Sequence, residues 1–415
     1  MRIAIPTRYA HAVGGVETYL ECVLPLLAGA GHDVKFWHEF DTVAGGRSVV
    51  PPGVPIGRLG PTSGAVEQGL ADIAAWKPDV VFSQGIAAVD AERRLQATAP
   101  MVVLLHAYHG ACISGNKMHA FPAPAPCSRK LGPGCLPRYH VRRCGGWSPV
   151  TMVASYREQR LRQTILHEAV TVAVLSDHMR RECILQGVDA ARVRQLPVFV
   201  PGRQDRVAGH AACGADAGVH IIFVGRMERL KGAHVLLSAL EQVAPAMLRD
   251  VRVTVVGDGR ERQRCEQQAV RLGAGGLRIE FTGWLSHERC AELVRTADLL
   301  AVPSVWPEPL GLVGLEASAA GVAAVAFDVG GVREWLTDNV TGRIVPGAPS
   351  EAGLARAIED CLRDRERLRR WGAAAADRVR PRTVAAHVSA LDGLLSAAAG
   401  IASHRDRVVE TGTYA

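Results

Sequence analysis

The chain has 415 residues, of which 48% are hydrophobic and 21% are charged, so we expect two α/β globular domains and no general disorder. No apolar run reaches the ~20 residues that span a bilayer, and the start Met-Arg-Ile-Ala-Ile-Pro is typical of a strand rather than a signal peptide, which indicates a cytoplasmic protein. The net charge of +7 permits attraction to anionic substrates or membrane surfaces without requiring either.

The first predicted unit is a strand over residues 2–6 followed by a helix that begins near Val16. Gly14 and Gly15 lie between them, where glycine lets the backbone approach a ligand closely; an ordinary strand-to-helix turn is the alternative. This turn does not carry the Gly-x-Gly-x-x-Gly pattern, which disfavours an NAD-binding domain.

Strands and helices continue to alternate, with strands predicted near residues 34–36, 80–83 and 101–105. His106 directly follows the last of these strands. Open α/β sheets bind their ligands beyond the carboxyl ends of the strands, so His106 is a candidate site residue, with a structural histidine as the alternative.

Residues 107–150 are unusual for this fold class, because cysteines, histidines, prolines and glycines are concentrated there. We interpret the segment as a long excursion over the mouth of a ligand cleft. Its thiols could bind zinc, form disulfides or stay reduced and pack, although their spacing lacks the Cys-x-x-Cys pairs of common zinc modules. These thiols belong to Cys112, Cys127, Cys135 and Cys144.

The same region, extended to residue 162, is rich in basic side chains. They could form a solvated face, or a surface that receives an anionic acceptor, such as a lipid-linked diphosphate, or an acidic membrane. Nucleic acid is disfavoured, because stacking aromatics are not interleaved with the charges. The residues are Arg129, Lys130, Arg138, Arg142, Arg143, Arg157, Arg160 and Arg162.

The first domain is predicted over residues 1–200, ending with a strand over 171–175 and a helix capped by Ser176. The polar, glycine-containing stretch 201–217 is the expected linker. A second domain follows over 218–382. A helix over 383–399 is expected to return to the first domain, and residues 400–415 form the expected tail.

The second domain opens on a predicted buried strand, and Arg226 and Lys231 stand on the loop behind it. A guanidinium and an ammonium in that position can hold a diphosphate and neutralise the charge that develops on a leaving group. Ordinary surface charge is the alternative.

Residues 302–321 carry the densest chemical pattern. Prolines break the loop behind a short strand, and a helix is predicted to start at Gly311. The amides of Gly311, Leu312 and Val313 are then unpaired at a helix start, which favours an anion. Glu308 lies in the loop and Glu316 in the helix, so one ligand with sugar rings on either side of a phosphate could meet both. A loop cap and a solvated helix face are the alternatives for the two carboxylates.

Glu308 and Glu316, with seven residues between them inside Glu-Pro-Leu-Gly-Leu-Val-Gly-Leu-Glu, resemble the paired-glutamate signature of retaining glycosyltransferases of family GT4. Gly-Arg followed by Lys-Gly at 225–232, and Gly-Gly-Val-Glu at 14–17, are similar to two further motifs of that family. The resemblance covers roughly nine-tenths of the chain. It implies the GT-B fold, with two Rossmann-like domains whose parallel sheets face a central cleft.

The resemblance also implies roles for the candidate residues. Glu308 would orient the donor sugar, Glu316 would bind the ribose, Gly15 beside Gly14 would lie against the phosphates, and His106 would line the cleft beside the transferring sugar. In relatives the loops that hold Gly257 and Trp284 lie near the base. Arg226, Lys231 and the amides of Gly311, Leu312 and Val313 would take the electrostatic role of a divalent ion, so neither a metal nor another cofactor is expected.

The expected reaction is hexosyl transfer from a nucleotide diphosphate sugar to an acceptor hydroxyl, with retention of configuration, in the biosynthesis of a glycan, glycolipid or glycosylated metabolite. The acceptor could be lipid-linked or anionic, with peripheral contact at the inner membrane face. The alternatives are a sugar-nucleotide epimerase, a phosphorylase, or a non-catalytic binding protein of the same fold.

Overall fold

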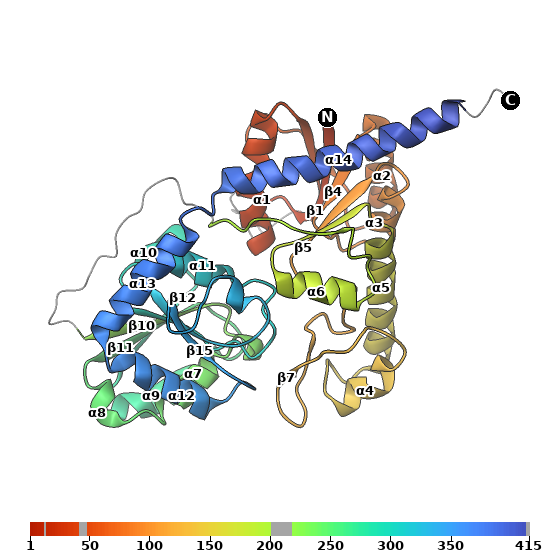
Figure 1. Ribbon diagram of the computed structural model, residues 1–415. Helices are drawn as coiled ribbons and strands as arrows, with labels where there is room; N and C mark the ends of the chain where they lie inside the picture. Colours follow the sequence, from red (N-terminus) through yellow and green to blue (C-terminus); the bar gives the residue numbers. More distant parts are fainter. Residues whose placement is uncertain (12–13, 41–47, 201–217, 412–415) are drawn as a thin grey trace. The chain divides into compact units, whose positions relative to one another are not determined.

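Figure 1 shows the computed structural model of the chain, which describes residues 1–11, 14–40, 48–200 and 218–411. Its residue contacts group into two compact units. Unit 1 comprises Met1–Lys117, Ser128–Gly202 and Thr383–Ala415, and unit 2 comprises Met118–Cys127 and Arg203–Arg382. Each unit contains a parallel sheet with helices, which confirms the α/β fold class. The linker predicted at 201–217 lies outside the described residues.

The sheet of unit 1 has the strand order β3-β2-β1-β4-β5-β8-β9, with all neighbours parallel. Its central strands are continuous apolar runs, as expected for strands covered on both faces. The strands are β1 (Arg2–Tyr9), β2 (Asp33–Phe40), β3 (Ile56–Arg58), β4 (Val80–Ser83), β5 (Met101–Leu105), β8 (Thr171–Val174) and β9 (Val193–Gln195).

Helices connect these strands, and two of their starts follow directly from side-chain caps. The Ser176 hydroxyl accepts the Met179 N–H and begins α6, as predicted, and Thr62 begins α2 in the same way. The helices of unit 1 are α1 (Gly15–Gly29), α2 (Ser63–Trp76), α3 (Val89–Leu95), α4 (Cys135–Val141), α5 (Pro149–Glu168), α6 (Asp177–Leu185) and α14 (Val384–Thr411).

The last helix, α14, packs on α1 in unit 1 (Figure 1). Val388, Leu391 and Leu395 of α14 belong to the same buried cluster as Ile3 of β1 and Leu20 of α1. The helix continues to Thr411, so most of the segment 400–415 that the sequence assigns to a tail is helical. None of the helices in the described part of the chain combines the length and hydrophobicity that crossing a bilayer requires.

The excursion at 107–150 is tied to unit 1 by buried polar contacts. Lys117 Nζ lies 2.6 Å from Glu182 Oε1 of α6, and the Leu131 N–H donates to Gln186 Oε1 at 2.7 Å. Residues 118–127, predicted as part of the first domain, instead group with unit 2 and contain the short antiparallel pair β6 (Met118–His119) and β7 (Ala125–Pro126).

In the described part of the chain the four cysteines of this excursion are not joined in disulfides, and Cys112 is buried while the other three are partly buried. Within the described ranges, no three metal-ligating side chains of His, Cys, Asp or Glu come together. The described residues therefore form neither an assembled zinc site nor a disulfide among these four cysteines.

The sheet of unit 2 has the strand order β12-β11-β10-β13-β14-β15, again parallel throughout. Its strands are β10 (Val219–Val224), β11 (Val251–Val256), β12 (Arg278–Gly283), β13 (Leu299–Val302), β14 (Ala323–Phe327) and β15 (Gly342–Val345). Its helical segments are η1 (Arg229–Lys231), α7 (Ala233–Leu240), α8 (Pro245–Leu248), α9 (Arg262–Ala274), α10 (His287–Val294), α11 (Leu312–Ala319), η2 (Val332–Glu334), α12 (Glu351–Leu362) and α13 (Arg365–Val379).

Both sheets reverse their strand order beside their first strand. In unit 1 the reversal lies between β1 and β4, and in unit 2 it lies between β10 and β13. Open parallel sheets bind ligands at such a switch point, beyond the carboxyl ends of the strands. The loops after β10 and β13 carry the basic and acidic residues singled out in the sequence, so the fold itself brings these loops together.

Candidate functional site

Lys231 and Glu308 meet at the switch point of unit 2. Lys231 ends the 3-10 turn after β10, and Glu308 lies in the loop after β13. Lys231 Nζ donates to the two carboxylate oxygens of Glu308 at 2.7 and 3.0 Å. Glu308 is only 4% exposed, so solvent screens this ion pair little. Two candidate residues that are 77 positions apart in the chain thus form one charged group.

Neighbouring side chains hold this ion pair in place. The Ser304 hydroxyl donates to Glu308 Oε1 at 2.6 Å, and Lys231 Nζ lies 5.1 Å from the ring centroid of Trp306, a cation–π distance. Sequence reasoning missed both residues. The available signal for Ser304 was a polar side chain directly behind a buried strand and four residues before the glutamate.

The backbone around Glu308 is equally constrained. The Gly331 N–H donates to the Glu308 carbonyl at 2.7 Å. Gly330 has φ +60°, and a Cβ atom added there would lie 2.1 Å from the same carbonyl oxygen. Only glycine allows this approach, so the loop after β14 fixes the loop that carries Glu308.

The helix predicted from Gly311 is confirmed as α11. Gly311 is its N-cap with φ +83°, and the amides of Leu312 and Val313 lie in the first turn, which has no intrahelical acceptors for them. Trp335 Nε1 donates to the Leu310 carbonyl at 2.8 Å and so holds the residue just before this turn. The helix start therefore presents N–H groups and a positive dipole end next to Glu308 in the chain.

Glu316 lies on α11 with its side chain 26% exposed. Burial raises the pKa of the Glu316 carboxyl above its ordinary value, and His287 opposes this rise. His287 Nδ1 lies 3.9 Å from Glu316 Oε1, a contact that the sequence did not suggest. Glu316 thus lies one turn after the start of α11, with a histidine beside it.

Arg226 is exposed on the loop that also carries Lys231, and within the described residues its guanidinium has no ion-pair partner. Gly257, at the end of β11, comes close to this loop: an added Cβ would lie 2.0 Å from the Gly225 carbonyl oxygen. Trp284, which follows β12, is 68% exposed. The structure brings Arg226 to the same loop as Lys231 but not into the ion pair with Glu308.

Gly14, Gly15 and His106 belong to unit 1. Gly14 is the N-cap of α1, and its N–H bonds to the carboxyl group of Glu17, which is 5% exposed. An acidic residue three positions after the N-cap forms half of a capping box. Glu17 therefore fixes the glycine turn and leaves the amide of Gly15 in the first turn of α1.

His106 lies directly behind β5, beside the end of β4. Its Nε2 donates to Gln84 Oε1 at 2.8 Å, and the ring of Tyr19 contacts it edge-on at 5.3 Å between centroids. Burial, reinforced by His387, lowers the pKa of His106 to about 4, so the ring is neutral near neutral pH. The bond to Gln84 Oε1 places the proton on Nε2, and the two contacts together fix the orientation of the ring.

Gln84 is a buried residue beside His106 that sequence reasoning missed. It is 3% exposed, and its Nε2 has no hydrogen-bond partner among the described residues. The Gln84 amide therefore has two unpaired N–H donors, and the neutral His106 ring, which donates from Nε2, carries a lone pair on Nδ1. A hydroxyl group both donates and accepts, so this pair is complementary to a sugar or polyol hydroxyl.

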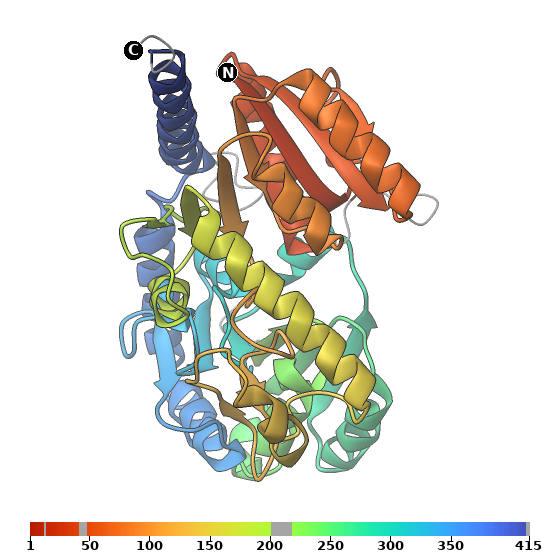
Figure 2. The ribbon, with the colours of Figure 1, turned by 90° about the vertical axis from the view of Figure 1, so that its right-hand side faces the viewer.

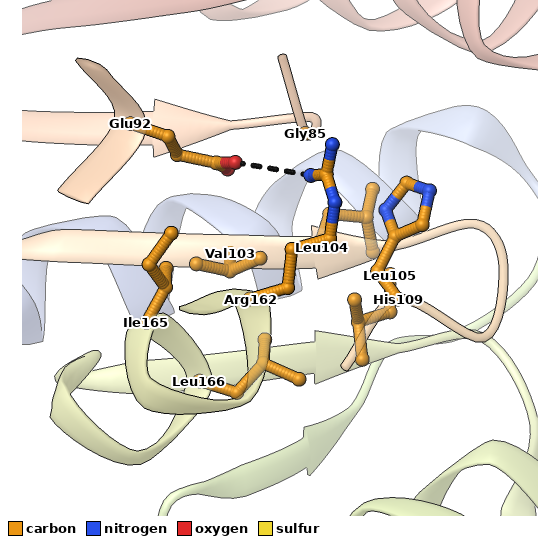
Figure 3. Close-up of a pocket in the computed structure, with 9 residues that line it drawn as sticks. All are labelled: Gly85, Glu92, Val103, Leu104, Leu105, His109, Arg162, Ile165 and Leu166. Atoms are coloured by element: carbon orange, nitrogen blue, oxygen red, sulfur yellow. Dashed lines mark hydrogen bonds and ion pairs between the residues drawn. The ribbon is translucent and has the colours of Figure 1, made fainter. Parts of the chain in front are cut away.

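A small cavity lies behind this region, between β5 and α5 (Figure 3). Its volume of about 10 Å³ is room for one water molecule. Arg162 Nη1 lies 3.4 Å from Glu92 Oε2, and Arg162 Nη2 donates to the Ile86 carbonyl at 2.9 Å. Burial, helped by Arg162, lowers the pKa of His109 to about 3. The network holds the loop that carries Gln84.

Arg162 corrects the sequence interpretation of the basic region. The sequence places it in a basic region expected at the surface, but it is 3% exposed and is paired with the buried Glu92. The reason is its position on α5, where it faces α3 rather than solvent. Its charge therefore stabilises the interior of unit 1 and is not available to an anionic partner.

The comparisons with known proteins agree over both units. Residues 14–198 match the glycosyl transferase 4-like domain, and residues 216–378 match glycosyl transferases group 1. A D-inositol 3-phosphate glycosyltransferase of Nocardia farcinica is 34% identical over 279 residues, which make up 65% of this chain and 56% of that relative. The chain thus spans about half the length of the curated relatives it matches.

Solved structures show the same fold at low sequence identity. The crystal structure of Anabaena HepE in complex with UDP has a TM-score of 0.68 and 18% identity, and the alignment covers 96% of this chain and all of HepE. A complex of HepE with UDP-glucose gives a TM-score of 0.66 at 18% identity, with 96% of this chain and all of HepE covered.

Proposed function

Because the chain belongs to the glycosyl transferases group 1 family, with the GT-B fold, we propose that it transfers a sugar from a nucleotide diphosphate sugar to an acceptor hydroxyl. In this reaction the bond between the anomeric carbon and the diphosphate oxygen breaks, and a bond from that carbon to the acceptor oxygen forms. The hydroxyl proton leaves with the diphosphate or to solvent. The observation that carries the proposal is the Lys231–Glu308 ion pair beside the start of α11.

In the proposed complex, the diphosphate lies against the positive groups of unit 2. Lys231, Arg226 and the amides of Leu312 and Val313 are the groups that can take up the charge of the leaving diphosphate. This is the task that a divalent ion has in other transferases, so the proposed reaction is independent of metal. The proposed stereochemical outcome is retention, in line with the paired-glutamate signature.

The two carboxylates bind hydroxyl groups on either side of the diphosphate in this proposal. Glu308 accepts hydrogen bonds from the sugar that is transferred, because its position is fixed by Ser304 and Lys231. Glu316 binds the ribose hydroxyls. A uridine diphosphate sugar such as UDP-glucose is the first donor to test, since HepE crystallised with both UDP and UDP-glucose.

For unit 1 taken by itself, we propose that Gly14, Gly15 and His106 are the ligand-binding residues. The amide of Gly15, held by the Glu17 cap, is suited to a phosphate oxygen, and the neutral His106 with Gln84 is suited to a hydroxyl group. The proposed acceptor is lipid-linked or anionic. A phosphorylated cyclitol is one anionic acceptor to test, because the curated relative acts on D-inositol 3-phosphate by its name.

The test begins with thermal unfolding of the purified chain in the presence of a panel of nucleotide diphosphate sugars. A true donor should stabilise the protein by about 2.7 kcal/mol when its concentration is 100-fold above its Kd. The stabilising donor is then incubated with and without acceptors, and the products are examined by NMR for the anomeric configuration.

The outcomes separate the alternatives. Transfer to an added acceptor with retained configuration, in the presence of a chelator, supports the proposal. Conversion of the donor sugar in the absence of acceptor would instead indicate an epimerase. If no nucleotide diphosphate or its sugar stabilises the protein, a non-catalytic protein of the same fold is the better interpretation.

A further inference from the structure

The ammonium group of Lys231 is largely taken up by contacts inside unit 2. It donates to Glu308 Oε1 at 2.7 Å and to Glu308 Oε2 at 3.0 Å, which uses two of the three N–H donors of an ammonium. The ring centroid of Trp306 lies 5.1 Å from the same nitrogen. A phosphate oxygen that binds Lys231 can therefore take the remaining donor, and stronger binding requires that the ammonium turn away from Glu308.

The carboxylate of Glu308 depends on this ammonium for its charge balance. Its side chain is 6% exposed, so water compensates the charge poorly. The Ser304 hydroxyl donates to Oε1 at 2.6 Å but carries no charge. Within the part of the chain that the structure describes, Lys231 is the one cation at ion-pair distance from Glu308. A ligand that draws Lys231 away must therefore offer Glu308 a hydrogen-bond donor, or leave a buried charge uncompensated.

The donor and the product of the proposed reaction differ at this point. A nucleotide diphosphate sugar brings hydroxyl groups, which can donate to Glu308 while the diphosphate engages Lys231. The free nucleotide diphosphate lacks those hydroxyl groups at its terminal phosphate, and that phosphate carries an additional negative charge near neutral pH. It therefore competes for Lys231, adds charge of the same sign beside Glu308 and offers Glu308 no hydrogen-bond donor.

We propose that the Lys231–Glu308 pair weakens binding of the free nucleotide diphosphate relative to binding of the nucleotide diphosphate sugar. The pair thus favours loading of the donor and release of the product after transfer, which is a role of Glu308 in addition to holding the sugar. The cause is the shared ammonium, because a ligand without hydroxyl groups cannot engage Lys231 fully without leaving the buried carboxylate unpaired. This inference rests on the proposed function, whose donor it uses.

Burial distinguishes this pair from an ion pair of the same geometry in unit 1. Lys35 of β2 donates to both oxygens of Asp72 of α2, at 3.2 and 3.0 Å, but the Asp72 side chain is 47% exposed. Both elements are drawn in red to orange in Figure 2. Water can hydrate Asp72 whenever Lys35 moves, so a competitor for Lys35 would leave no buried charge unpaired. The Lys35–Asp72 pair is therefore a matched control.

The test is isothermal titration calorimetry of the full chain with a nucleotide sugar and with its free nucleotide diphosphate, beginning with UDP-glucose and UDP. The measured quantity is the Kd of the free nucleotide diphosphate divided by the Kd of the nucleotide sugar. Glu308→Gln keeps the shape of the side chain but removes its charge, so this ratio should fall about tenfold. Ser304→Ala should raise the ratio about threefold, because Glu308 then depends on Lys231 alone.

Asp72→Asn should leave both Kd values unchanged, and circular dichroism should show that the variants are folded. If Glu308→Gln does not fold, the change of the ratio in Ser304→Ala decides. A ratio that stays the same in folded Glu308→Gln and Ser304→Ala would overturn the inference, while nucleotide binding and the proposed function would stand. If the unchanged chain binds no nucleotide diphosphate and no nucleotide sugar of the panel, the proposed function and the inference both fail.

Discussion

Lys231 does two things at once in this structure. It is the proposed ligand of the donor diphosphate, and it also neutralises a glutamate that is 4% exposed. A buried carboxylate without its partner is costly, because the remaining charge is neither hydrated nor paired. Changes at Lys231 should therefore affect folding as well as turnover, which a surface lysine would not do.

Lys231→Ala should lower turnover by about 100-fold or more, because the charge on the leaving diphosphate loses its ammonium partner. It should lower the free energy of unfolding by about 1–3 kcal/mol, since Ser304 still donates to Glu308. Steady-state kinetics and denaturant unfolding measure the two effects separately.

Lys35→Ala is the matched control. Lys35 also contacts both oxygens of a carboxylate, Asp72, at 3.2 and 3.0 Å, and lies 4.7 Å from the centroid of a tryptophan ring, Trp37. That pair is exposed, so the variant should lose at most about 1 kcal/mol and keep its turnover. Equal turnover in Lys231→Ala and Lys35→Ala would contradict the proposed role of Lys231.

At the level of loops and helices, the site is positioned by close backbone approaches rather than by side chains alone. The loop after β14 contacts the backbone of Glu308 through Gly330 and Gly331, and Trp335 supports the start of α11. Glycine is needed at Gly330 both for its positive φ and for the space. These contacts explain why the glutamate loop, which contains three prolines, has a defined position.

Gly330→Ala should abolish most activity and destabilise the protein, because its methyl group would lie 2.1 Å from the Glu308 carbonyl oxygen and displace the loop. Gly347→Ala is the control, since Gly347 also has a positive φ of +81° but an added Cβ meets nothing within 4 Å. The control should lower the free energy of unfolding by only about 1 kcal/mol, the cost of a non-glycine residue at positive φ, and should keep its activity. Thermal unfolding and turnover of both variants check this, and similar activity losses in the two would show that the contact with Glu308 is unimportant.

At the scale of the whole molecule, unit 1 buries several histidines in their neutral form. Burial lowers the pKa of His106 to about 4 and that of His109 to about 3. Burial, with Arg181 and Lys117 nearby, also lowers the pKa of His178 to about 4. In the unfolded chain these rings titrate near pH 6.5. Protonation of any of these rings therefore lowers the stability of unit 1.

Stability should consequently fall as the medium becomes acidic. Between the folded pKa values and about pH 6.5, the unfolded chain binds more protons than the folded chain. The free energy of unfolding therefore rises with pH across this window and reaches its full value above it. His178→Gln should reduce this dependence, because glutamine can still accept the hydrogen bond of the Tyr108 hydroxyl but does not titrate. Denaturant unfolding at pH about 5 and about 7 measures the difference, and an unchanged difference in the variant would refute the role of His178.

The sequence was sufficient for those parts of the molecule that depend on neighbouring residues. Apolar runs, the prolines at 303, 307 and 309, and the caps at Ser176 and Gly311 act over a few positions, so the strands, loops and α11 could be predicted. The motifs around Arg226, Lys231 and Glu308 likewise indicated the family before any contact was known. The predicted surface position of Arg162 was wrong, because a run of basic residues in the sequence does not indicate which of them become buried.

Only the tertiary structure decided which of these residues meet. The Lys231–Glu308 pair forms because β10 and β13 are neighbours, and His106 meets Gln84 because β4 and β5 are neighbours. Strand order is a property of the whole sheet, and no pattern of a few residues specifies it. For the same reason the burial of Arg162 against Glu92 and the exposure of Trp147 became visible only once α3, α4 and α5 were packed on their neighbours.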